Sequence, residues 1–293
     1  MPTLEQLLAG GAVVTDGAWG TQLQARGLDA GEVPDGWNLS HPDRVEQVAR
    51  TYVEAGSQVI LTNTFRANRL TLREYGLSDR TVEINRAGAA LSRRAADGHA
   101  LVFASIGPSG KMLMMGDVTE DELFSAFREQ AGALAEGGAD ALVVETMADL
   151  AEAAIAIRAA RETDLPVVGS AVFDTGKQKD RTLMGATPEQ AAAELEAAGA
   201  HVVGANCGVG IAAYVDVCRR MRAVTSRPIW IKANAGLPEL VDGRTIWRMT
   251  AAEFAGYVPA LLAAGANFIG GCCGTGPEFI RAISAALAAR VAP

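Results

Sequence analysis

The 293-residue sequence lacks any unbroken apolar run of the roughly 18 to 20 residues that a membrane-spanning helix needs, although hydrophobic residues make up 49% of it. It also lacks an excess of basic residues. With 34 acidic and 26 basic residues, its net charge is −8, which offers no general attraction to nucleic acid or anionic lipid. The N-terminal residues show no positively charged segment followed by an apolar one. We therefore expect a soluble cytoplasmic protein that binds neither nucleic acid nor membranes.

Cysteine is scarce as well, with four residues in the chain. In a cytoplasmic protein, four cysteines of which two are adjacent are poor candidates for disulfides and better candidates for metal or thiol chemistry. No C-x-x-C motif is present, which argues against a disulfide oxidoreductase. The chain also has no proline- or serine-rich linker and no low-complexity segment. We therefore expect one domain over residues 1–293.

What the sequence does contain is a repeated unit, in which a short apolar run is followed by an alanine- and charge-rich stretch of helical periodicity. The runs are continuous rather than alternating, as is typical of parallel strands that are buried on both faces. Eight of them are predicted as strands: residues 12–15, 58–62, 101–105, 141–144, 167–171, 201–205, 229–232 and 267–270. Clear helices are predicted over residues 120–137, 188–198 and 251–264. Eight such units predict an α/β fold, a single (β/α)8 barrel, with residues 3–9 as a helix under its floor.

Three cysteines follow predicted strands, where the carboxyl ends converge on the mouth of the barrel. Cys207 lies in GANCGVG after the sixth strand, and Cys272 and Cys273 lie in GGCCGTG after the eighth. Adjacent cysteines on a strand point to opposite faces, so a shared core position explains them poorly. Cys218, in a helical stretch, is expected to be an ordinary core residue.

Three thiolates suit Zn²⁺, which accepts sulfur ligands and prefers four in a tetrahedron. A structural site would be closed by a fourth cysteine or histidine, and neither turn supplies one nearby. We therefore predict a zinc site on Cys207, Cys272 and Cys273 with one position open to a substrate. The long connections over residues 17–42 and 173–187 leave the same ends of the strands and are candidates for substrate cover.

Two acidic residues also follow apolar strands, where a charge needs a partner. They are Asp16, in VTDGAWG, and Glu145, in VVETM. A substrate ammonium would be one such partner, and a structural ion pair with a lysine or arginine would be another. Lys232, in IWIKANAG, leaves open a Schiff-base aldolase, although no phosphate-binding signature accompanies it.

Motifs along nearly the whole chain resemble the homocysteine-binding domain of the homocysteine S-methyltransferase family, which includes cobalamin-dependent methionine synthase and the betaine- and S-methylmethionine-dependent enzymes. The resemblance rests on DGAWGTQLQ, TNTFRAN, SIGPSG, VETM, GANCG, ANAGLP and GGCCGTGP, in the family's order. It implies a β/α barrel in which the three cysteines hold zinc and homocysteine sulfur is the fourth ligand. It further implies that Asp16 and Glu145 lie near the homocysteine ammonium, that groups around Ser105 and the first loop hold its carboxylate, and that Asn206 and Asn234 orient the site.

The resemblance implies methyl transfer to homocysteine to give methionine, but the methyl donor is less defined. The motif wording is closest to the cobalamin-dependent methionine synthase type, yet the sequence has no folate- or cobalamin-binding domain and no D-x-H-x-x-G corrinoid signature. We therefore expect methylcobalamin on a separate corrinoid protein. The alternatives are S-methylmethionine or S-adenosylmethionine as donor, another thiol or a demethylation reaction, and a non-catalytic zinc-binding barrel. Trp19, Arg66 and Ala233 depart from the residues usual in the family, and all three are expected near the mouth.

Overall fold

The computed structural model describes residues 4–29, 31–241 and 244–291. Eight parallel strands form one sheet in the order β1-β10-β7-β6-β5-β4-β3-β2. The strands are β1 Val13–Val14, β2 Val59–Ile60, β3 Leu101–Ile106, β4 Ala141–Met147, β5 Val167–Ala171, β6 Val202–Cys207, β7 Ile229–Ala233 and β10 Ala266–Gly271. The predicted single β/α barrel is confirmed.

The barrel closes between its two shortest strands, β1 and β2, through residue Gln58. The backbone amide of Gln58 donates to the carbonyl of Val14 at 2.8 Å, and its side-chain oxygen accepts from the amide of Val14 at 3.0 Å. The side chain therefore takes the place of a backbone group in the ladder at this seam.

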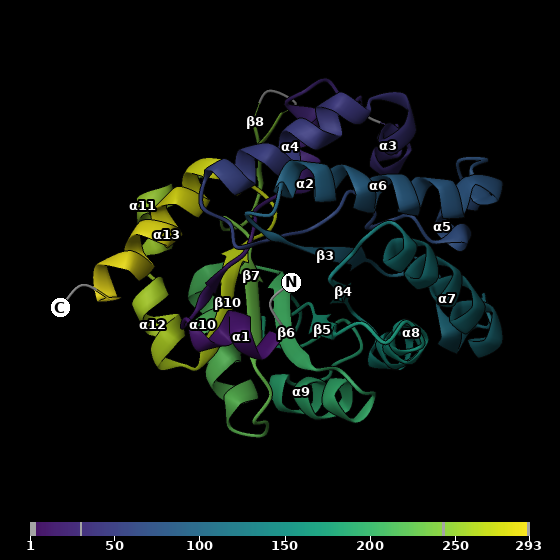
Figure 1. The fold of residues 1–293 in the computed structure, drawn as a ribbon. Helices are drawn as coiled ribbons and strands as arrows, with labels where there is room; N and C mark the ends of the chain where they lie inside the picture. The colour runs from purple at the N-terminus through teal and green to yellow at the C-terminus, as the bar shows by residue number, and fades with distance from the viewer. Residues whose placement is uncertain (1–3, 30, 242–243, 292–293) are drawn as a thin grey trace.

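Helices surround the sheet (Figure 1). They are α1 Leu4–Ala9, α2 Trp19–Gln24, α3 Trp37–Ser40, α4 Pro42–Glu54, α5 Arg69–Arg73, α6 Thr81–Ala96, α7 Glu120–Glu136, α8 Leu150–Arg161, α9 Pro188–Ala197, α10 Ile211–Arg222, α11 Ala251–Ala255, α12 Val258–Ala263 and α13 Pro277–Val291, with short 3₁₀ turns at η1 Pro34–Gly36, η2 Ser78–Arg80 and η3 Leu113–Met115. Two further strands, β8 Glu239–Val241 and β9 Arg244–Ile246, form an antiparallel hairpin. Within the described ranges, no helix combines the length and apolarity needed to cross a membrane.

Most strand boundaries differ from the sequence prediction by one or two residues, and β1 and β2 are shorter than the predicted 12–15 and 58–62. The helix predicted over residues 251–264 is two helices, α11 and α12, because Pro259 in the first turn of α12 has no N–H to continue a helix from α11. Strand β4 runs on past residue 144 to Met147 across a register irregularity, and β6 runs on past residue 205 to Cys207. Glu145 and Cys207 therefore lie inside strand ends rather than beyond them. Residue 3 of the predicted first helix lies outside the described residues.

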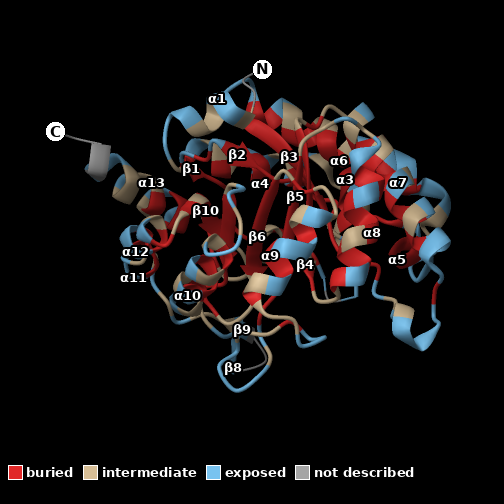
Figure 2. Cartoon of the chain, turned by 90° about the horizontal axis from the view of Figure 1, so that it is seen from below, coloured by how far each residue is buried: buried red, intermediate tan, exposed pale blue. Residues whose placement is uncertain are grey.

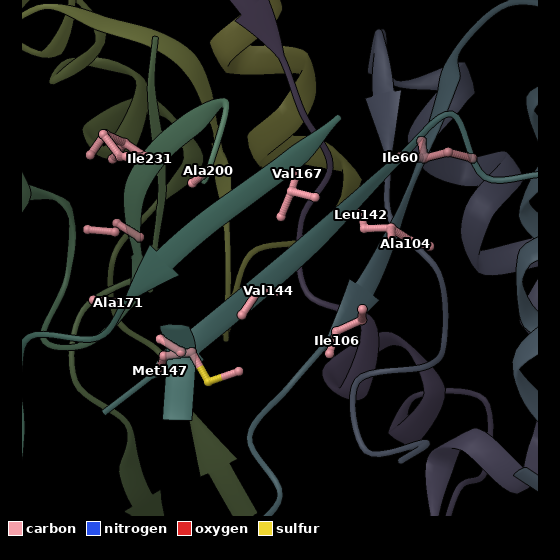
Figure 3. Packing of buried hydrophobic residues seen from close by; sticks show 14 of the residues in the cluster. Ile60, Ala104, Ile106, Leu142, Val144, Met147, Val167, Ala171, Ala200 and Ile231 are labelled. Atoms are coloured by element: carbon pink, nitrogen blue, oxygen red, sulfur yellow. The ribbon is translucent and has the colours of Figure 1, made fainter. Parts of the chain in front are cut away.

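Side chains alternate between two cores. Those facing outward, such as Leu142 and Val144 of β4, form one apolar cluster with side chains of the helices, and Figure 3 shows part of this cluster. Those facing inward form a second apolar cluster that includes Val143 and Trp230. Leucines of α1 pack against this inner cluster, so α1 covers the barrel floor, as predicted. Figure 2 shows α1 and the β8–β9 hairpin at opposite ends of the barrel, with the buried strands between them.

Candidate functional site

The barrel interior changes from apolar to polar toward the carboxyl ends of the strands. Because side chains alternate along a strand, the residue two positions after an inward-facing side chain faces inward again. Val143 is followed in this way by Glu145, and Trp230 by Lys232. The top layer of the interior therefore carries charged side chains above an apolar plug.

A cavity of about 310 Å³ opens at this end of the barrel. Five of the predicted site residues line it: Ser105, Glu145, Cys207, Cys272 and Cys273. The other three, Asp16, Asn206 and Asn234, are buried but do not line it. The structure thus separates the predicted residues into those that can touch a ligand and those that support the wall.

The three cysteines from β6 and from the turn after β10 come together. Their sulfur atoms all lie within 4.8 Å of one another. In a tetrahedral zinc site with Zn–S bonds of about 2.3 Å, the sulfurs would stand about 3.8 Å apart, so the cluster fits such an ion after small rotations. All three side chains are partly exposed, and all three line the cavity.

The electrostatics of the cluster also suit a cation. Hydrogen bonds from the thiols of Cys272 and Cys273 lower the pKa of Cys207, and donating these bonds to Cys207 raises the pKa of each donor thiol. By itself the cluster therefore favours one thiolate beside two thiols. A dication would supply the positive charge that three thiolates need.

Backbone geometry places Cys207 at the cavity. Its φ of 66° lies in the left-handed region, which is rare for a residue other than glycine. Backbone strain of this kind is concentrated at functional sites. The next residue, Gly208, has φ 64°, and a Cβ there would come within 2.4 Å of the Tyr214 hydroxyl oxygen. That hydroxyl donates to the carbonyl oxygen of Asn206 at 2.8 Å, so the strand end cannot relax outward.

Asn234 joins the two cysteine-bearing turns. Its side-chain oxygen accepts from the amide of Cys273 at 2.9 Å, and its side-chain nitrogen donates to the carbonyl of Gly208 at 2.6 Å. The amide of Cys272 donates to the carbonyl of Ala233 at 2.7 Å. One buried side chain therefore fixes the spacing between Cys207 and the Cys272–Cys273 pair.

Asn206 performs a similar task at the end of β4. Its side-chain oxygen accepts from the Thr146 amide at 2.8 Å and from the Ser170 hydroxyl at 2.7 Å. Its side-chain nitrogen donates to Glu145 Oε2 at 3.2 Å and to the Thr146 hydroxyl at 2.6 Å. Thr146 has φ 61°, so Asn206 stabilises a second left-handed residue beside the cavity.

Glu145 presents a buried carboxyl group to the cavity. Its other oxygen, Oε1, accepts from the Ser105 hydroxyl at 2.5 Å. Burial raises the pKa of Glu145 to about 7, and this outweighs the opposing effects of the Lys232 charge and the Ser105 hydrogen bond. A cationic group in the cavity would therefore favour the ionised carboxylate.

Asp16 has the lysine partner that the sequence analysis left open as an alternative. Its Oδ1 forms an ion pair with Lys232 Nζ. Its Oδ2 accepts from the Trp19 indole nitrogen and from the Leu61 amide, both at 2.7 Å. Lys232 was noted in the sequence only as a possible Schiff-base lysine, and its partner lies 216 residues away, so the pair left no local signal.

Among the other residues that line the cavity, Asp35 and Trp19 were not predicted as site residues. Asp35 is 1% exposed, accepts from the Arg66 amide at 3.0 Å, and has a pKa that burial raises to about 6. Trp19 lines the cavity while its indole nitrogen is held by Asp16. Both lie in the 17–42 connection, which the sequence analysis identified as possible substrate cover. Trp19 was expected near the mouth as a departure from the family, and Asp35 was not singled out.

Comparison with known proteins assigns this architecture. Residues 13–287 match the family model described as homocysteine S-methyltransferase. The chain belongs to the homocysteine S-methyltransferase family. It is 32% identical over 307 aligned positions to the methionine synthases of Mycobacterium tuberculosis (strain ATCC 25618 / H37Rv) and Mycobacterium leprae (strain TN), and each match covers 97% of this chain. The chain spans about a quarter of the length of these relatives, with 25% of each covered.

Solved structures of the same family share the fold. The homocysteine methyltransferase MmuM from Escherichia coli superposes with a TM-score of 0.78 in its metallated form, at 23% identity, covering 94% of this chain and 96% of MmuM. Its oxidized form gives a TM-score of 0.79 at 24% identity, covering 95% and 98%. The match to the family model and to the methionine synthases confirms the family resemblance read from the sequence motifs.

Proposed function

We propose that this family member is a zinc-dependent S-methyltransferase that transfers a methyl group to homocysteine and so forms methionine, with residues 1–293 as its homocysteine-binding domain. The observation that carries the proposal is the cluster of three cysteine sulfurs within 4.8 Å of one another, which opens onto a cavity that also holds a buried carboxyl group. A metal-binding position and a cation-binding position share one cavity.

Cys207, Cys272 and Cys273 would hold Zn²⁺ and leave one coordination position for the acceptor sulfur. Bound zinc keeps a coordinated thiol deprotonated and nucleophilic at neutral pH, where a free thiol of pKa about 8.5 is mostly protonated. The cysteine turns contribute rigidity, because Asn234 and the left-handed Cys207 hold the two turns that carry the proposed ligands at a fixed spacing.

Glu145 is the proposed partner of the acceptor ammonium. Ser105 holds one of its oxygens and Asn206 holds the other, so the carboxyl plane is fixed before substrate arrives. Backbone groups of the first loop and around Ser105 line the same cavity and are proposed to hold the acceptor carboxylate. By holding the ammonium and carboxylate groups of the acceptor, the protein would orient the acceptor thiol toward the metal.

We propose methylcobalamin on a separate corrinoid protein as the methyl donor. Three loops that leave the carboxyl ends of β3, β5 and β7 carry exposed apolar side chains, among them Met114 at 70%, Leu183 at 64% and Leu240 at 77% exposed. Exposed apolar groups on loops at the end of the barrel where the cavity opens are typical of a surface that another protein covers, and methionine adapts readily to such contacts.

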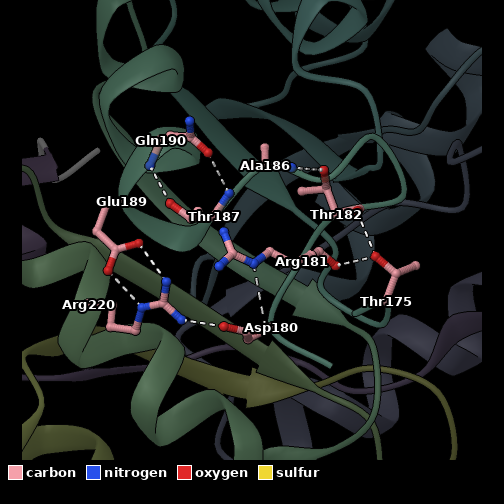
Figure 4. A network of polar contacts seen from close by, with 9 residues as sticks. All are labelled: Thr175, Asp180, Arg181, Thr182, Ala186, Thr187, Glu189, Gln190 and Arg220. Atoms are coloured by element: carbon pink, nitrogen blue, oxygen red, sulfur yellow. Dashed lines mark hydrogen bonds and ion pairs between the residues drawn. The ribbon is translucent and has the colours of Figure 1, made fainter. Parts of the chain in front are cut away.

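The middle loop of the three, residues 173–187, is held in place from outside the mouth. Figure 4 shows Arg220 of α10 bridging two acidic residues, with bonds of 2.7 and 2.8 Å to Glu189 and 2.6 Å to Asp180. These bonds restrain the loop that carries Leu183 and Met184. A restrained loop supports the proposal that its exposed apolar side chains form a docking surface for another protein.

A small sulfonium donor is the second candidate. The aromatic side chains of Trp19 and Phe65 line the same cavity, and an aromatic face attracts a cation within about 6 Å of its centre. S-methylmethionine or S-adenosylmethionine could then approach the acceptor inside the cavity without a carrier protein.

One assay separates these possibilities. Zinc-loaded protein is incubated with homocysteine and, in parallel, methylcobalamin, S-methylmethionine or S-adenosylmethionine, and methionine is quantified. Methionine from methylcobalamin supports the corrinoid route, and methionine from a sulfonium supports the second candidate. Replacing homocysteine by cysteine or glutathione tests the acceptor. Stoichiometric zinc without transfer from any donor would indicate a binding protein and contradict the proposal.

A further inference from the structure

Lys232 is a buried cation at the cavity that the proposed mechanism does not use. It extends from β7 into the polar layer, and its side chain is 2% exposed while that of its partner, Asp16, is 0% exposed. Charges so far from water are very unfavourable unless they are paired, so each of these groups depends on the other.

Protein donors fill three of the roughly four acceptor positions of Asp16, and one of these donors is a cation. Lys232 occupies Oδ1, and the Trp19 indole and the Leu61 amide both donate to Oδ2. Asp16 also does not line the cavity. A substrate ammonium placed at Asp16 would have to displace Lys232 or lie against it, and two cations in contact within a buried site repel strongly.

Glu145 differs from Asp16 in its access to the cavity and in its hydrogen-bond donors, although the Lys232 charge acts on it as well. It lines the cavity, each of its oxygens receives one bond, and both donors are neutral side chains, Ser105 and Asn206. An ionised carboxylate has about four acceptor positions, so Glu145 retains capacity for an ammonium that enters the cavity.

We propose that Lys232 is an internal counter-ion of Asp16 that prevents Asp16 from binding the substrate. Glu145 alone then binds the acceptor ammonium, and Asp16 holds Trp19 in the cavity wall. This differs from the family resemblance, which implies that both carboxylates lie near the ammonium. The inference rests on the proposed function, because it takes an amino acid thiol as the acceptor.

The test compares two acceptors that differ only in the ammonium group: homocysteine and its desamino analogue, 4-mercaptobutanoate. The ratio of kcat/KM for the two reports ammonium recognition and is independent of the fraction of active, zinc-loaded enzyme. It is measured for the unmodified protein, for Glu145→Gln, and for the charge-neutral pair Asp16→Asn/Lys232→Gln, with Asp16→Asn/Lys232→Met as a second version of the pair.

Glu145→Gln is expected to lower the ratio by about 30-fold or more, because it removes one partner of a buried charged contact. Either double variant is expected to keep the ratio within about threefold of the unmodified protein, since both charges leave together. A ratio that survives Glu145→Gln, or one that collapses in a folded double variant, would overturn the proposal. Absence of transfer to homocysteine by the unmodified protein would instead contradict the proposed function.

Discussion

The two sides of the barrel mouth are built by different means. On the sulfur side, formed by β6, β7 and β10, backbone geometry places the cysteines: a left-handed Cys207, a glycine that tolerates no side chain, and the Asn234 contacts to two turns. On the acidic side, around Asp16 after β1, Ser105 of β3 and Glu145 of β4, side chains place one another. The Asp16–Lys232 ion pair and the hydrogen bonds that Ser105 and Asn206 donate to Glu145 do this, with Lys232 and Asn206 reaching across from β7 and β6.

Because the two sides are built differently, substitutions on them should impair the protein in different ways. Loss of one sulfur ligand leaves too few donors for the metal, so damage on the sulfur side should be nearly complete. Loss of one carboxylate contact leaves the metal site intact, so damage on the acidic side should weaken acceptor binding by degrees. The predictions below test this division, beginning with the largest expected effect.

Cys272→Ala is expected to abolish both zinc retention and methyl transfer while the barrel stays folded. The reason is that two thiolates cannot replace the three-sulfur site. Zinc content, methyl-transfer rate and circular dichroism are measured together. Cys218→Ala is the matched control, because Cys218 is buried in the outer core away from the mouth, and it should retain zinc and activity. Methyl transfer by Cys272→Ala at the rate of the unmodified protein would contradict the zinc model.

Asn234→Ala is expected to weaken zinc binding by about 10- to 100-fold, the range found when groups that support metal ligands are removed. It deletes the contacts to Cys273 and Gly208 but leaves all three sulfurs. A competition titration with a zinc chelator measures the effect, and Asn267→Ala, which removes a side-chain contact to the Ile229 amide away from the cavity, serves as control. Equal zinc affinity in both variants would contradict this role of Asn234 and show that the backbone alone positions the three cysteines.

Glu145→Gln is expected to raise the homocysteine KM by about 30-fold while zinc content stays at one ion per chain. The amide keeps the size of the side chain but cannot compensate an ammonium. Glu129→Gln, which removes an exposed ion pair with Arg69 on the outer helices, is the control and should leave KM unchanged. An unchanged KM in Glu145→Gln would remove this carboxyl group from acceptor binding.

The smallest expected effect is a pH dependence of the acidic side. The pKa of Glu145 is raised to about 7, so the carboxylate that binds an ammonium is mostly ionised at pH 8 and mostly protonated at pH 6. The homocysteine KM should therefore rise about tenfold from pH 8 to pH 6 as the ionised fraction falls. The same profile measured with Glu145→Gln should lack this component, and identical profiles would assign the titration to another group.

The convergence of the three cysteines could be predicted from the sequence, whereas the pairing of Asp16 with Lys232 could not, for a physical reason. Both cysteine motifs are local, and their glycines mark tight turns within a few residues of the ligands. The Asp16–Lys232 pair joins residues 216 positions apart, and which side chain pairs with which depends on barrel register. The apolar runs and helical stretches of the β/α units are also local signals, and they were sufficient to predict the barrel fold.

Other features depended on tertiary contacts that periodicity does not report. The extension of β4 to Met147 requires pairing with Ala171 across an irregular register. Asp35 reaches the cavity because its loop contacts the segment after β2, where Asp35 accepts from the Arg66 amide and the Pro34 carbonyl accepts from the Asn63 side chain. The break between α11 and α12 had a local cause, Pro259, which the helical composition of the stretch obscured.

The central claim is that the three cysteines hold zinc with one position reserved for the acceptor sulfur. X-ray absorption at the zinc edge, recorded on purified protein before and after addition of homocysteine, measures it directly. We predict three sulfur ligands at about 2.3 Å with one lighter ligand before addition, and four sulfur ligands afterwards. A zinc environment that homocysteine does not change, or one without three sulfurs at the start, would contradict the account.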